Sequence, residues 1–79
     1  MNIRTKAVSD SKIRATGAGK QRTITINPDE NISRNHAEAA TTLYRVLIQG
    51  ERAQELGLRD ASCKIEGDVS VFTFPHIKM

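Results

Sequence analysis

The longest regular pattern of hydrophobic and polar positions runs through residues 32–49. With residues spaced about 100° apart around a helix, Ala40, Leu43 and Leu47 fall at the centre of one apolar face. Threonines and charged side chains fall on the opposite arc. Because the apolar arc is wide, we expect a helix that lies flat across a β-sheet.

Both ends of this helix are marked in the sequence. Ser33 is a favourable N-cap, and Ile32 before it is placed to contact the first helical turn. Gly50 follows the last periodic residue and suits a left-handed C-terminal cap. A second short helical turn over residues 51–56 is predicted to end at Gly57.

Shorter runs with a period of two predict strands. In residues 22–26, Ile24 and Ile26 would face the helix, and Thr23 and Thr25 would lie on the reverse face. Residues 61–65 and 69–74 flank Gly67-Asp68, a pair that suits a type II′ hairpin turn. Counting back from that turn places Glu66 opposite Val69, Ile65 opposite Ser70, Cys63 opposite Phe72 and Ala61 opposite Phe74. Val69, Val71 and Thr73 then join the threonines on the reverse face.

These elements predict a small α+β domain of order β-α-β-β, with a three-stranded sheet and one helix packed on one face. The strand order stays open. Residues 1–20 have no sustained period and contain the glycine-rich stretch 15–19, which favours a flexible, disordered leader. We therefore divide the chain into a flexible basic leader (1–20), a single domain (21–75) and a short tail (76–79).

Length and composition indicate one small domain with an aliphatic core. The chain has 79 residues, one Tyr, two Phe and no Trp. The single cysteine, Cys63, cannot form an internal disulfide, which favours a reducing compartment. No apolar run is long enough to span a bilayer, and no secretory signal opens the sequence. We expect a cytoplasmic protein with no membrane association.

Charge is divided unevenly along the chain. Residues 1–22 carry a net charge of +5 and the remainder carries −2. The basic residues of the leader are Arg4, Lys6, Lys12, Arg14, Lys20 and Arg22. Such a segment is typical either of a nucleic-acid-binding arm or of a solubilising terminus.

Catalytic and cofactor signatures are weak. The stretch 17–20 has glycines and a lysine, but Arg14 stands where a phosphate-binding loop needs glycine, and Gln21 stands where it needs Ser or Thr. His36 and Cys63 could form a nucleophilic pair only with a cleft and an orienting group, so packing roles are favoured. With His76 they lack the spacing of a metal site. We expect no enzyme activity, no cofactor and no metal.

Two binding hypotheses follow. The first is protein binding or self-association through the uncovered sheet face formed by Thr23, Thr25, Val69, Val71 and Thr73. Threonine-rich faces also tolerate water, so this face could be merely solvated. The second hypothesis is binding of nucleic-acid phosphates through the six leader cations, without aromatic residues for base stacking.

One resemblance favours the first hypothesis. The run Arg22-Thr-Ile-Thr-Ile-Asn and the later run Asn31-Ile-Ser-Arg-Asn-His-Ala-Glu-Ala-Ala40 resemble a type of small uncharacterised reading frame common in bacteriophages and prophages. The resemblance covers about residues 21–74. It implies an accessory protein of the bacterial host cytoplasm that binds and inhibits or modulates a host protein. The alternative is a nucleic-acid-associated protein that uses its basic leader.

Overall fold

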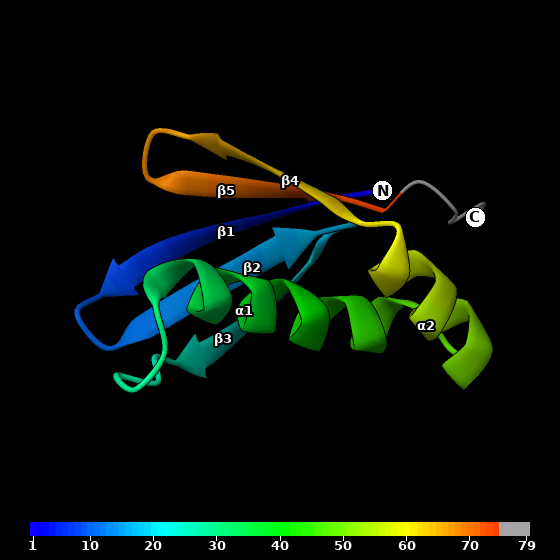
Figure 1. The fold of residues 1–79 in the computed structure, drawn as a ribbon, viewed down its shortest axis with the longest axis horizontal. Helices are drawn as coiled ribbons and strands as arrows, with labels where there is room; N and C mark the ends of the chain where they lie inside the picture. Colours follow the sequence, from blue (N-terminus) through cyan, green and yellow to red (C-terminus); the bar gives the residue numbers. More distant parts are fainter. Residues whose placement is uncertain (75–79) are drawn as a thin grey trace.

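The chain folds into one five-stranded sheet with two helices on one side, in a computed structural model that describes residues 1–74. Residue 75 and the predicted tail, residues 76–79, lie outside the described residues. The elements are β1 (Asn2–Ser9), β2 (Lys12–Gly17), β3 (Lys20–Thr25), α1 (Ile32–Leu47), α2 (Glu51–Arg59), β4 (Ser62–Glu66) and β5 (Val69–Thr73). All neighbouring strands are antiparallel, in the order β3-β2-β1-β5-β4 (Figure 1).

This architecture corrects the predicted fold. The class α+β is right, but the three-stranded sheet with one helix and a disordered leader is wrong, because residues 2–17 form strands β1 and β2. β1 lies at the centre of the sheet, between β2 and β5. Its inward positions Ile3 and Thr5 are fully buried and alternate with exposed cations, and Ile13 and Ala15 do the same in β2. Small and polar inward residues give little hydrophobic periodicity, so the strands are visible only from their pairing with one another, with β3 and with β5.

A tight turn replaces the predicted glycine-rich linker. Gly17 pairs with Lys20, and the two residues between them, Ala18 and Gly19, have φ values of 50° and 74°. Positive φ at both central residues defines a type I′ turn, whose twist matches that of paired antiparallel strands. The glycine-rich stretch therefore connects β2 to β3 in a hairpin.

The β4–β5 hairpin has the predicted register. Glu66 pairs with Val69, Ile65 with Ser70 and Cys63 with Phe72. Gly67 has a φ of 64° and the φ of Asp68 is not positive, as a type II′ turn requires. β5 then pairs with β1 on its other side, which makes β4 an edge strand.

Helix α1 crosses the sheet over β1, β2 and β3, and the core lies between them (Figure 1). Ala39, Ala40, Leu43 and Tyr44 of α1 are buried against the inward side chains of these strands. The wide apolar arc predicted from the sequence is thus the buried face, although Leu47 is only half-buried. The predicted N-cap of α1, Ser33, is wrong. The cap is Asn31, whose Oδ1 accepts a hydrogen bond from Arg34 N at 2.8 Å.

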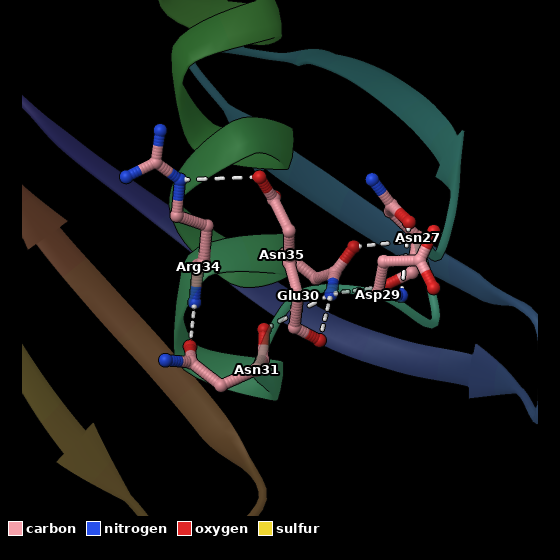
Figure 2. Close-up of polar contacts among 6 residues, drawn as sticks. All are labelled: Asn27, Asp29, Glu30, Asn31, Arg34 and Asn35. Atoms are coloured by element: carbon pink, nitrogen blue, oxygen red, sulfur yellow. Dashed lines mark hydrogen bonds and ion pairs between the residues drawn. The ribbon is translucent and has the colours of Figure 1, made fainter.

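A buried asparagine joins the start of α1 to the loop that precedes it (Figure 2). Asn35 Oδ1 accepts from Asn27 N at 2.7 Å, and its Nδ2 lies 3.0–3.3 Å from the carbonyl oxygens of Asn27, Glu30 and Asn31. Arg34 also pairs with Glu30 at 3.6 Å. These contacts place α1 relative to the end of β3.

Helix α2 continues past the glycine predicted to end it. Gly57 is buried beneath the ring of Tyr44, where a Cβ atom would collide with the Tyr44 hydroxyl. That hydroxyl donates to Ala53 O at 3.3 Å, and the Tyr44 ring stacks on Phe74 with centroids 4.3 Å apart. Gly57 therefore allows close approach of the two helices. Within residues 1–74, no helix is long and apolar enough to cross a membrane.

Candidate functional site

The sheet face opposite the helices, here called the open face, is basic. Side chains alternate along each strand, and directly paired residues share a face, so the register assigns its members. They are Asn2, Arg4, Lys6, Val8, Lys12, Arg14, Thr16, Gln21, Thr23, Thr25, Ser62, Lys64, Glu66, Val69, Val71 and Thr73. Five of them are cations and one, Glu66, is a carboxylate. The face therefore has a strong excess of positive charge.

The cations gather on the central strand β1 and its neighbour β2. Lys6 of β1 lies directly opposite Arg14 of β2, and Arg4 lies one pair further along, opposite Thr16. Like charges directly opposite each other across a strand pair destabilise the sheet. Lys6 has a partial counter-charge in Asp68, at 3.7 Å with both side chains well exposed. Within residues 1–74, Arg4 and Arg14 make no ion pair.

A hollow of about 270 Å³ lies within this cluster. It is lined by Arg4, Lys6, Val8, Arg14, Thr16 and Val69. The lining thus combines three cationic side chains with two valines and a threonine. Three positively charged side chains around a hollow that is open to solvent favour the approach of a negatively charged group.

The open face has less exposed apolar surface than its sequence suggests. Val71 is only 9% exposed, although no helix covers this side of β5. It lies between Arg4 of β1 and Lys64 of β4, directly opposite both. The aliphatic stems of these long side chains cover the valine while their charged ends stay in water.

The two predicted binding surfaces are one surface. All five residues predicted for protein binding lie on the open face: Thr23, Thr25, Val69, Val71 and Thr73. Four of the six predicted leader cations lie there as well: Arg4, Lys6, Lys12 and Arg14. Lys20 and Arg22 instead lie on the helix side of the edge strand β3. Lys64 of β4 also lies on this face, opposite Val71. Alternation along the predicted hairpin places it on the reverse face, but it was not among the residues predicted to bind a partner.

His36 and Cys63 have separate surroundings. His36 is buried in α1, and its Nδ1 lies 2.7 Å from Thr5 Oγ1, which also donates to Ser70 O at 3.5 Å. Burial lowers the pKa of His36 by desolvation, so the ring is neutral at pH 7. Cys63 is exposed on β4. Within residues 1–74, no hydrogen bond joins the two side chains, and no group of three or more His, Cys, Asp or Glu residues could hold a metal ion.

Comparisons with known proteins give no relative: no family model, no curated protein and no solved structure matches this chain.

Proposed function

We propose that this protein binds nucleic-acid duplexes through the open face, by contacts to the phosphate backbone. The observation that carries the proposal is the placement of Lys6 directly opposite Arg14, with Arg4 beside them, on the central strand β1 and its neighbour β2. This arrangement costs stability in the free protein. A ligand that brings several regularly spaced negative charges to the face would turn the same repulsion into binding free energy.

The distribution of aromatic residues favours a duplex over a single strand. Proteins that bind single strands without sequence preference stack bases on exposed aromatic rings. The three aromatic residues of this chain, Tyr44, Phe72 and Phe74, are all buried on the helix side. The open face therefore has no aromatic ring for base stacking, which leaves its cations as the main binding groups, and a duplex presents phosphates at the higher density.

The experiment is a binding titration of the full chain with a labelled duplex and a single strand of equal length, across a series of salt concentrations. Three or four phosphate contacts predict a slope of about −3 in log K against log salt for the duplex. The double substitution Arg4→Gln/Arg14→Gln should weaken binding and reduce the slope by about 2. The matched control Arg45→Gln/Arg52→Gln removes two exposed cations from the helices and should change neither quantity.

Three results would contradict the proposal: no duplex binding at low salt, an equal loss in the control variant, or equally tight binding of polyglutamate. The last result would assign the open face to acidic protein surfaces. The accessory role implied by the phage resemblance, binding and modulation of a host protein, stays a prediction.

A further inference from the structure

The sheet has two edges, and they differ in how they are protected. On β3, Lys20 and Arg22 place charge on the helix side, and α1 packs against the strand. Charges and covering elements are the usual means by which proteins prevent pairing at a sheet edge. On β4 the helix side carries Cys63 and Ile65, and α1 lies over β1–β3 instead (Figure 1). The edge at β4 is therefore the one open to pairing.

The backbone of β4 has a defined set of free groups. Glu66 and Val69 close a two-residue turn, so they form a hydrogen-bonded pair, and such pairs alternate along the strand. The backbone groups of Lys64 and Glu66 therefore point toward β5. Those of Cys63 and Ile65 point away from the sheet, where a further strand would bond to them.

Ile65 is the main apolar feature of this edge. It is 68% exposed, more than any other large hydrophobic residue in the described part of the chain. Further along β4, an apolar hollow of about 210 Å³ lies between the helices and the strand, and its lining includes Ala40, Cys63 and Phe72. A strand added to β4 with an apolar residue opposite Ile65 would remove the Ile65 side chain from water.

We propose that the added strand is β4 of a second copy of this chain, antiparallel, with the two-fold axis passing at Ile65. The two Ile65 residues then lie opposite each other, and Lys64 of each copy lies opposite Glu66 of the other. Within one chain these two side chains form an exposed ion pair at 3.8 Å, which the dimer would extend into a four-charge network. Two other symmetric registers use the same free backbone groups. An axis at Lys64 places Lys64 opposite Lys64, and an axis at Cys63 places Lys64 opposite Ser62, so neither forms an opposite-charge pair between the copies. Charge complementarity therefore selects a second copy in the first register.

The result is a continuous ten-stranded sheet, twice the five strands of one chain. Because paired residues share a face, both sets of helices lie on one side and both open faces on the other. The inference does not rest on the proposed function, since its test contains no nucleic acid. The basic surface would be about twice as long in the dimer.

Sedimentation equilibrium of the full chain tests the proposal between about 5 µM and 500 µM protein. The wild type should show a reversible monomer–dimer equilibrium. Ile65→Lys and Lys64→Glu should each be monomeric throughout, because the first places two cations at the axis and the second opposes two carboxylates. The exchange Lys64→Glu/Glu66→Lys should restore the dimer. Circular dichroism confirms that each variant is folded, as expected for exposed positions.

Cross-linking tests the register. In a Cys63→Ser background, Ile65→Cys places two thiols opposite each other with Cα atoms about 5.5 Å apart, within reach of a disulfide. Oxidised glutathione should then convert this variant to a covalent dimer. The wild type, whose Cys63 residues do not lie opposite each other in this register, should form no disulfide cross-link. A monomer at every concentration, a dimer that persists in Ile65→Lys, or no cross-link at position 65 would each overturn the proposal.

Discussion

At the scale of single residues, Asn35 has the largest share of the polar contacts that position α1. It is 2% exposed, and its amide group contacts one backbone N–H and three carbonyl oxygens of residues 27–31. An amide is the side chain that can accept and donate in this way. Its removal would leave Asn27 N and Glu30 O without this partner, whereas the carbonyl oxygens of Asn27 and Asn31 still accept from Glu30 N and Asn35 N.

We expect Asn35→Asp to destabilise the fold by at least about 2 kcal/mol, although the shape is preserved, because a carboxylate cannot donate to three carbonyl oxygens and would be buried beside them. Urea unfolding measures this. The cap variant Asn31→Ala is the comparison, with an expected cost of about 1 kcal/mol. A smaller loss for Asn35→Asp than for Asn31→Ala would contradict the role assigned to Asn35.

His36 makes stability depend on pH. Its pKa is lowered by burial, so the folded protein resists protonation, whereas the unfolded chain takes up a proton near the usual pKa of about 6.5. The stabilisation is therefore complete above about pH 6.5 and is lost as the pH falls below it, by at most about 1.4 kcal/mol per pH unit. Urea midpoints between about pH 7.5 and 5.5 should fall for the wild type and for His76→Gln, but stay level for His36→Gln. If the urea midpoint of His36→Gln fell as steeply with pH as that of the wild type, titratable groups other than His36 would cause the pH dependence.

At the scale of elements, the β2–β3 hairpin contains an avoidable strain. Ala18 has a φ of 50°, a value that costs an alanine about 1 kcal/mol and that asparagine tolerates better. Asn-Gly is the preferred pair for a type I′ turn. We expect Ala18→Asn to raise the melting temperature by about 4–8 °C, and Ala18→Val to lower it, in a thermal unfolding experiment. Equal melting temperatures for the two variants would mean that the turn is not type I′.

The same scale shows which elements could be predicted from sequence. The β4–β5 hairpin was predictable in register because Val69, Phe72 and the Gly67 turn are strong local signals. β1 and β2 were not, because Thr5 and Ala15 occupy inward positions and give a weak alternation. For the open face, the residues were predictable but their assembly was not, since it depends on which strands become neighbours.

At the scale of the whole molecule, the cations of the open face lower the stability of the free protein and favour binding of a negatively charged ligand. Replacing Arg14 by threonine removes a like-charge contact with Lys6 and introduces a residue suited to strands. We expect Arg14→Thr to raise the free energy of unfolding at low salt by about 0.2–1 kcal/mol and to reduce the salt slope of duplex binding by about 1. Thermal unfolding at low and high salt, together with the binding titration, measures both. A destabilised variant with unchanged binding would contradict the assignment of Arg14 to the site.

By itself, the sequence determined the α+β class, the long amphipathic helix and the final hairpin, because each rests on local periodicity or turn chemistry. The tertiary structure alone decided that residues 2–17 lie in the middle of the sheet, since pairing of β1 with the distant strand β5 and packing of α1 on both strands place them there. It also decided that Gly57 lies within a helix, because this position needs glycine for the close approach of the Tyr44 ring and not to end the helix. The basic face belongs to the same group: alternation along β1 and β2 and their pairing bring Arg4, Lys6 and Arg14 together.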